Sequence, residues 1–270
     1  MLPVILTVAG SDPSGGAGIQ ADLSTIAALG GYGTSAVAAI TVQNSQEFRC
    51  ARPVEPDLVR DQIDAIFKDM PVAAVKTGML VDADVIVAVA RVLGAAGPVR
   101  IVVDPVMAAT TGGASMDDDG VAAIRQHLMP LATLMTPNVP EAERLTGCKV
   151  RTVEDGIRAS RMLLGLGARA VLLKGGHLAA SPGTDVLVTG ETEEVLPGVW
   201  QDQPHSHGTG CVLSAAIATY LGLGDDLGPA VRRGRTFLAR ALAHGRAPGG
   251  GPGSVNPLFR LVDEEGSKEP

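Results

Sequence analysis

Cysteine is scarce in this chain, and no stretch combines the length and the low charge of a membrane span. The three cysteines, Cys50, Cys148 and Cys211, stand at unrelated spacings without a CxxC pair. This pattern argues against a disulfide framework and a zinc site, and it suits a reducing cytoplasm. The apolar residues 2–8 lack a basic flank and run into a Gly-Ser-Asp-Pro turn at residues 10–13, so we expect a first strand and loop rather than a signal peptide.

Positive charge is also in short supply. The net charge of -7 gives no electrostatic reason to expect a nucleic acid or an acidic membrane as partner, so anionic ligands must be captured locally. Hydrophobic residues make up 46% of the 270 residues and charged residues 19%, which excludes disorder. We expect one domain over residues 1–260 and a frayed tail at 261–270, with the glycine-rich residues 247–253 forming a loop or part of a frayed end.

Short apolar, β-branched runs alternate with longer amphipathic ones, which is typical of an α/β protein. The sequence predicts a mostly parallel sheet with helices on both faces, and an antiparallel edge hairpin within residues 184–200. Ligands then belong at the carboxyl ends of the strands. Strands are expected at residues 2–9, 35–42, 72–76, 99–104, 133–136 and 170–174, and helices at 19–29, 56–67, 84–93, 120–128, 140–145, 154–166 and 210–221.

The run His-Gly-Thr-Gly-Cys at residues 207–211 stands directly before an alanine-rich helical stretch. Gly208 and Gly210 allow a tight turn, and the helix start offers free N–H groups and the positive end of the helix dipole. We therefore expect an anion site in which Cys211 has a lowered pKa and acts as a base or nucleophile. The alternative is a tight turn before a buried helix, with Cys211 packed as a small hydrophobic residue.

Three predicted strands are followed by charged side chains, which we expect to lie at the same edge of the sheet. Asp104 and Glu141 are hard oxygen ligands suited to Mg²⁺, and Lys174 with the glycine amides after it can neutralise a triphosphate. Each residue also has a plainer interpretation. Asp104 can form a turn before Pro105, Glu141 can stabilise the first turn of a helix, and Lys174 can be solvated.

The glycine-rich first loop, residues 10–18, invites a comparison with dinucleotide-binding enzymes because residues 16–21 match GxGxxA. An NAD oxidoreductase needs an acidic residue at the end of the second strand, and residues 40–44 provide none. A Walker-type ATPase is disfavoured as well, since no Lys-Ser or Lys-Thr follows a GxxxxG spacing.

Seven motifs in order resemble the hydroxymethylpyrimidine and phosphomethylpyrimidine kinases of thiamine biosynthesis, members of the ribokinase-like superfamily. The similarity covers nearly the whole chain. Two departures keep the proposed chemistry intact, because Ser206 replaces a threonine and Thr77 replaces a common isoleucine. The motifs are GSDPSGGAG with IQAD at residues 10–22, TVQN at 41–44, KTGML at 76–80, VDPVM at 103–107, TPNVPEA at 136–142, KGGH at 174–177 and HGTGC at 207–211.

The resemblance implies a three-layer ribokinase-like fold, ATP and Mg²⁺ as cofactors, a possible monovalent cation, and a homodimer. It implies phosphorylation of the pyrimidine alcohol, its monophosphate, or both. Gln43 also suits this role on its own chemistry, since an amide offers a donor and an acceptor to a heteroaromatic edge, though it can be purely structural. The resemblance places the pyrimidine on Gln43, Gly10, Asp22, Lys76, Met79, Val106 and Met107, the nucleotide on Asn138, Lys174, Gly175 and Thr209, Mg²⁺ on Asp104 and Glu141, and catalysis on Cys211, Lys174, Gly208 and Gly210.

Other interpretations stay open at this point. Some pyridoxal kinases share the cysteine, and pyridoxal is a flat ring with a hydroxymethyl group, so a pyridoxal kinase is the runner-up. Sugar kinases carry an aspartate where Cys211 stands and are disfavoured. A nucleotide sensor without catalysis is a further alternative. Met79 and Met107 can be core fillers, and no catalytic role is expected for His177, His205 or His207.

Overall fold

The computed structural model describes residues 2–108, 116–178, 181–198 and 205–261. Nine strands in these residues form one sheet in the order β3-β2-β1-β4-β5-β6-β7-β8-β9. The six strands from β2 to β7 in that order run parallel, and β3, β8 and β9 are antiparallel to their neighbours. The strands are β1 (Val4–Ser11), β2 (Tyr32–Gln43), β3 (Phe48–Pro53), β4 (Val72–Thr77), β5 (Arg100–Val103), β6 (Leu134–Met135), β7 (Ala170–Leu173), β8 (Asp185–Thr189) and β9 (Glu193–Leu196).

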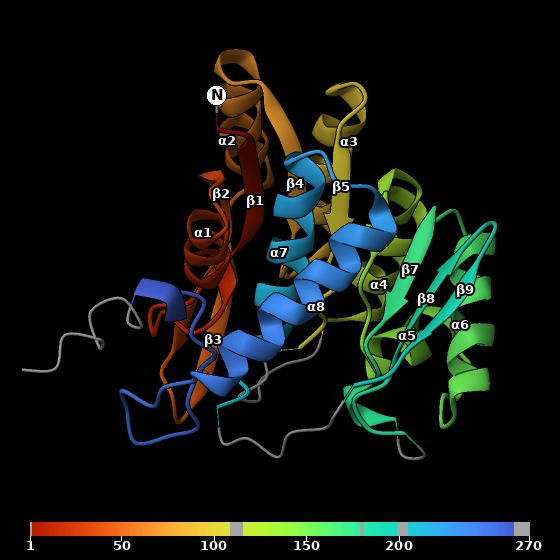
Figure 1. The fold of residues 1–270 in the computed structure, drawn as a ribbon. Helices are drawn as coiled ribbons and strands as arrows, with labels where there is room; N and C mark the ends of the chain where they lie inside the picture. Colours follow the sequence, from red (N-terminus) through yellow and green to blue (C-terminus); the bar gives the residue numbers. More distant parts are fainter. Residues whose placement is uncertain (1, 109–115, 179–180, 199–204, 262–270) are drawn as a thin grey trace, which may run out of the picture.

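Helices cover both faces of this sheet, as the sequence predicts (Figure 1). A π-helical turn (Ile124–Leu128) and a 3-10 turn (Met129–Leu131) extend α4, and a second 3-10 turn (Gly175–His177) follows β7. No helix in the described ranges is both long and apolar enough to span a membrane. The α-helices are α1 (Gly18–Ala28), α2 (Pro56–Asp69), α3 (Ala83–Ala95), α4 (Asp118–Ala123), α5 (Val139–Thr146), α6 (Val153–Gly165), α7 (Thr209–Gly222) and α8 (Leu227–Ala243).

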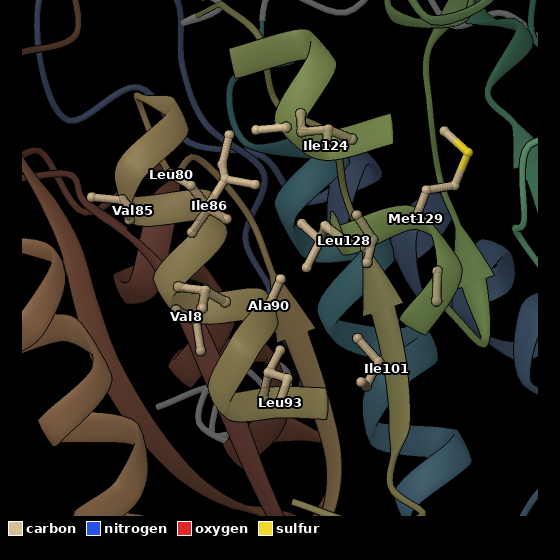
Figure 2. Close-up of a cluster of buried hydrophobic side chains, with 14 of the residues drawn as sticks. Val8, Leu80, Val85, Ile86, Ala90, Leu93, Ile101, Ile124, Leu128 and Met129 are labelled. Carbon is tan, nitrogen blue, oxygen red and sulfur yellow. The ribbon is translucent and has the colours of Figure 1, made fainter. Parts of the chain in front are cut away.

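The strands divide their side chains between two cores because successive residues point to opposite faces. Leu6 and Val103 pack with α2, α3 and α4 on one face, where Figure 2 shows side chains of α3 beside Ile101 of β5. Ile5 and Val102 pack with α1, α7 and α8 on the other face. Apolar strands that are buried on both faces thus produce the three-layer arrangement.

The expected edge hairpin is confirmed as β8 and β9; the end of the expected segment, residues 199–200, lies outside the described residues. Two elements were not predicted. Strand β3 pairs antiparallel with β2 and closes the other edge, and α8 packs along α7. Of the expected tail at 261–270, Leu261 is described and residues 262–270 lie outside the described residues.

The glycine-rich stretch near the C-terminus is packed as a loop against the turn between β2 and β3. The Gly251 amide donates to Ser45 Oγ at 3.3 Å, and a Cβ at Gly251 would lie 1.9 Å from the Ser45 carbonyl oxygen. The Gly253 carbonyl accepts from the His207 amide at 3.2 Å. Of the two alternatives for this stretch, a loop is therefore the correct one.

Candidate active site

A cleft opens at the carboxyl ends of β1, β2 and β4, where the parallel sheet predicts a ligand site. It brings together six of the predicted site residues from five separate sequence motifs: Gly10, Gln43, Lys76, Met79, Val106 and Cys211. Thr41 and Ala108 also contribute, and the first loop supplies one wall. The remaining lining residues are Ala9, Ser11, Asp12, Ala17, Gly18 and His207.

Gln43 offers the cleft an unused acceptor. Its Oε1 atom is buried and has no hydrogen-bond partner among the described residues. A buried acceptor without a partner is unfavourable by about 1–3 kcal/mol, so such an atom marks a place where a ligand donor fits. This observation favours a binding role for Gln43 over a structural one.

Lys76 and Asp22 form a fully buried ion pair at the inner wall of the cleft. The Lys76 ammonium donates to Asp22 Oδ1 and Oδ2 at 2.9 and 2.8 Å, and Thr7 Oγ1 donates to Asp22 Oδ2 at 2.6 Å. Burial opposes the charged ammonium, but the Asp22 carboxylate outweighs it and holds the pKa of Lys76 above its usual value. Lys76 lines the cleft, whereas Asp22 is buried behind Lys76 as its counter-ion and does not line the cleft itself.

The apolar wall includes Met79 and Val106 but not Met107, so the expectation for Met107 is wrong. Met107 is buried in the core cluster under α3 and α4. The chain turns after Asp104, where the Val106 amide donates to the Asp104 carbonyl at 2.8 Å. Successive residues then point in opposite directions, Val106 toward the cleft and Met107 toward the core.

Cys211 stands in the first turn of α7, at the edge of the cleft, as the sequence predicts. Its expected lowered pKa is wrong. Burial raises the pKa of the Cys211 thiol to about 11, although nearby Lys76 acts in the opposite direction. Cys211 also packs against the small hydrophobic cluster between α1, α7 and α8, as the alternative interpretation anticipated. The neutral thiol is therefore the resting form at pH 7.

Alkylation by iodoacetamide tests this pKa. We expect the rate at Cys211 to rise about tenfold per pH unit from pH 7 to 10, because only the thiolate reacts. The cysteine of a short unstructured peptide, measured in parallel, should level off near the ordinary cysteine pKa of about 8.5. Peptide mass spectrometry separates Cys211 from Cys50 and Cys148. A Cys211 rate that levels off below pH 8 would contradict the raised pKa.

Close packing requires glycine at Gly208, the residue before α7, and leaves little space at Gly210 in the first turn of the helix. Gly208 has φ of +85°, and a Cβ there would lie 2.0 Å from the Gly16 carbonyl oxygen. A Cβ at Gly210 would lie 3.2 Å from Lys174 Nζ and 3.5 Å from Asp104 Oδ2. The start of α7, with Thr209 as its first residue, thus faces a lysine across a space that a side chain would fill. Free amides, the helix dipole and an ammonium make this an environment for an anion.

Asp104, Glu141 and Lys174 do meet at one sheet edge, and this expectation is confirmed. Lys174 Nζ donates to Asp104 Oδ1 at 2.7 Å and lies 4.0 Å from Glu141 Oε2, so Lys174 is not solvated. Thr136 Oγ1 and Ser214 Oγ also donate to Asp104, at 3.1 and 3.2 Å.

The two carboxyl groups have opposite pKa shifts. Burial opposes ionisation of Asp104, but Lys174 and Lys76 outweigh it and hold the pKa of Asp104 below its usual value. Burial, assisted by the negative charge of Asp104, raises the pKa of Glu141 to about 7 although Lys174 opposes it. Asp104 is therefore the firmly ionised member of the pair.

Asn138, Glu141 and Gly175 already have structural partners. Asn138 Oδ1 accepts from the Glu141 amide at 2.8 Å, and Glu141 Oε2 accepts from the Asn138 amide at 2.7 Å, which caps α5. The plainer interpretation of Glu141 thus holds, whether or not the residue also binds a metal. The Gly175 amide donates to Asp185 Oδ1 at 2.9 Å, and a Cβ at Gly175 would lie 1.6 Å from the Thr184 carbonyl oxygen.

Asp12 and His207 were missed by the sequence reasoning. Asp12 accepts from the Ser14 amide and hydroxyl and from the Ala17 amide at 2.7–2.8 Å, and it lies 3.1 Å from His207 Nε2. Burial opposes ionisation, but the hydrogen bonds from His207 and Ser14 outweigh it and lower the pKa of Asp12 to about 2. The pair joins the first loop to the start of α7. An aspartate two residues before a serine in a glycine-rich loop was the available signal.

Comparisons with known proteins identify relatives of this chain. The chain is 46% identical over 259 residues to the thiamine biosynthesis bifunctional protein ThiED of Geobacter sulfurreducens, covering 96% of this chain and 53% of that protein. The chain thus spans about half the length of that relative. It is 44% identical over 244 residues to the hydroxymethylpyrimidine/phosphomethylpyrimidine kinase of Rhizobium meliloti, covering 90% of this chain and 91% of the relative.

The fold has close counterparts among solved structures. The ADP complex of Bacillus subtilis pyridoxal kinase has a TM-score of 0.88 and 36% identity, covering 97% of this chain and all of that one. The expected ribokinase-like fold is thereby confirmed. Residues 12–256 match the family described as phosphomethylpyrimidine kinase. Because this match spans most of the sequence, the chain belongs to the phosphomethylpyrimidine kinase family.

Proposed function

We propose that this protein transfers the γ-phosphoryl group of ATP to 4-amino-5-hydroxymethyl-2-methylpyrimidine and to its monophosphate, giving the pyrophosphate used in thiamine biosynthesis. The observation that carries the proposal is the unpartnered Oε1 of Gln43 in a cleft that ends at the first turn of α7. An aminopyrimidine presents a donor to that oxygen and a flat face to Met79 and Val106. The names of the curated relatives support the pyrimidine substrates, and the ADP complex of the Bacillus pyridoxal kinase supports ATP as the phosphoryl donor.

The cluster of Asp104, Glu141 and Lys174, next to the cleft, is suited to bind the nucleotide. In our proposal the phosphates of ATP bind beside Lys174 and the amides at the start of α7, where Gly210 carries no side chain that would stand in their way. Lys174 then neutralises charge on the transferring group, and the helix end stabilises it without reorganisation. Asn138, Gly175 and Thr209 are the proposed neighbours of the nucleotide.

The donor set fits Mg²⁺. Asp104 and Glu141 supply hard oxygens beside the proposed phosphate site, and Mg²⁺ is usually held by one or two carboxylates together with substrate phosphates. Mg²⁺ bound there would add positive charge next to the phosphates. No cluster of three potential metal ligands occurs in the described ranges, which suits a metal that arrives with its nucleotide.

Cys211 faces the acceptor end as a neutral thiol beside Lys76. A pyrimidine alcohol must lose a proton during transfer, and a thiol with a pKa of about 11 is seldom ready to accept it at pH 7. The monophosphate is already an anion and needs no such step. We therefore expect the monophosphate to be the faster substrate at neutral pH.

A side-by-side kinase assay tests the proposal. Purified protein is supplied with Mg²⁺-ATP and, separately, the pyrimidine alcohol, its monophosphate and pyridoxal, and ADP release and product mass are followed. Phosphorylation of the pyrimidines with a higher kcat/KM than that of pyridoxal supports the proposal. The solved pyridoxal kinase with a TM-score of 0.88 makes pyridoxal the second candidate, and a preference for it would replace our assignment. Absence of turnover with all three would favour a nucleotide sensor.

Gln43→Ala is expected to weaken pyrimidine binding by about 1–3 kcal/mol, because polar groups of the buried ring lose their partner. Isothermal titration calorimetry measures this change, and the affinity for ATP should stay the same. Gln46→Ala, at an exposed position three residues away, is the matched control. An equal loss for both ligands would show that Gln43 is structural.

A further inference from the structure

A second cavity, of about 300 Å³, lies on α8, away from the cleft. Arg233, Phe237 and Arg240 are four and three residues apart, so they lie on one face of the helix. Figure 1 shows α8 crossing in front of α7 at this place. The full lining is Tyr220, Arg232, Arg233, Thr236, Phe237, Arg240 and Arg260.

The cavity concentrates positive charge in a chain whose net charge is -7. Arg232 pairs with Glu194 at 2.9 Å and Arg233 with Asp225 at 2.6 Å. Arg240 and Arg260 form no ion pair with any residue in the described ranges. Within the described ranges, two of the four guanidinium groups are therefore neutralised and two positive charges remain at the cavity.

Aromatic rings hold these guanidinium groups in place. The Arg233 guanidinium lies 4.0 Å from the centre of the Tyr220 ring, and those of Arg240 and Arg260 lie 4.9 and 5.9 Å from the centre of the Phe259 ring. Such contacts with a ring reduce the freedom of the guanidinium group and leave N–H groups available to a ligand. Arg240 and Arg260, which share Phe259, are the two without a carboxylate partner among the described residues.

We propose that this cavity binds a phosphate-bearing small molecule, distinct from the nucleotide and the substrate of the cleft. Two uncompensated guanidinium groups balance the charge of a phosphate dianion, and their forked N–H groups match its oxygens. Thr236 adds a hydroxyl at the same wall. Tyr220 follows Cys211 by nine residues on α7, which places the cavity about 14 Å along that helix from the cleft.

The proposal is tested with inorganic pyrophosphate as the ligand, in an experiment that measures its protection of each arginine separately. Full-length protein is treated with phenylglyoxal with and without pyrophosphate, and modification is mapped by peptide mass spectrometry. We expect pyrophosphate to protect Arg240 and Arg260 and to leave Arg91, an exposed arginine of α3, unprotected. In calorimetry, R240Q/R260Q should weaken this binding about tenfold or more, since each lost charge-assisted hydrogen bond is strong. R91Q is the matched control.

Three outcomes overturn the proposal. In the first, Arg240 and Arg260 remain unprotected at pyrophosphate concentrations that saturate the proposed phosphate site beside Lys174. In the second, R91Q weakens pyrophosphate binding as much as R240Q/R260Q does. A chain ending at Leu261, which lacks Asp263, Glu264 and Glu265, supplies the third test. Protection seen only in this shortened chain would mean that those carboxylates compete for the arginines and that the full chain does not take a free anion. The four arginines that line the cavity are exposed, so we expect the variants to fold normally. Circular dichroism verifies this.

Discussion

Replacing Lys174 with methionine is expected to lower kcat about 10²- to 10³-fold and to change the KM for the pyrimidine little. In the structure Lys174 faces the start of α7 across the space beside Gly210 and lies 2.7 Å from Asp104. A cation placed at the transferring group acts mainly in the transition state, so its loss appears in kcat. Steady-state kinetics with the pyrimidine monophosphate and Mg²⁺-ATP measures the effect.

The control for this variant addresses folding. K174M leaves the buried Asp104 without its nearest counter-ion, so thermal unfolding is followed and rates are compared well below the midpoint. Thr136→Val removes a neutral hydrogen bond to the same carboxylate, at 3.1 Å, without changing charge. Near-normal turnover in K174M, or an equal loss in T136V, would show that Lys174 is a structural partner of Asp104 only.

Replacing Lys76 with methionine is expected to lower the free energy of unfolding by about 3–5 kcal/mol, because the fully buried Asp22 carboxylate loses its only counter-charge within 3 Å in the described ranges. The double variant K76M/D22L should recover most of this loss, since no buried charge is then left alone. Urea denaturation measures both. Lys149→Met breaks the exposed pair with Glu143 and is the control, with an expected loss of at most about 1 kcal/mol. A K76M loss as small as that of K149M would contradict the buried-pair interpretation.

Local patterns were sufficient to predict most of the sheet and the residues at its edge. The apolar runs before Asp104 and Lys174 had to be buried on both faces, and parallel strands bring their carboxyl ends together. Helix α8 escaped notice because Arg232, Arg233 and Arg235 dilute its apolar face. Its buried positions include the small residues Ala230 and Gly234. Strand β3 was hidden in the same way, since an edge strand with arginines lacks a continuous apolar run.

The chemistry of the site was less predictable than its location. Helix-end geometry alone favours a thiolate at Cys211, but burial by residues distant in the sequence raises the pKa to about 11. The contact of Asp12 with His207 likewise joins residues 195 positions apart. Burial and long-range contacts of this kind depend on which segments meet in the folded protein, so they cannot be predicted from the local spacing of residues.

The first loop packs against His207 and Ser254, which are paired by an isolated β-bridge, and this packing has a consequence for the order of folding during synthesis. A Cβ at Gly16 would lie 2.6 Å from the His207 ring and 2.9 Å from Ser254, so the first loop packs tightly against residues synthesised about 190 and 240 positions later. During synthesis the first loop therefore waits for His207 and Ser254 before the wall of the cleft that it forms can pack. Binding competence should therefore arise late and abruptly during translation, after the last glycine-rich segment has emerged.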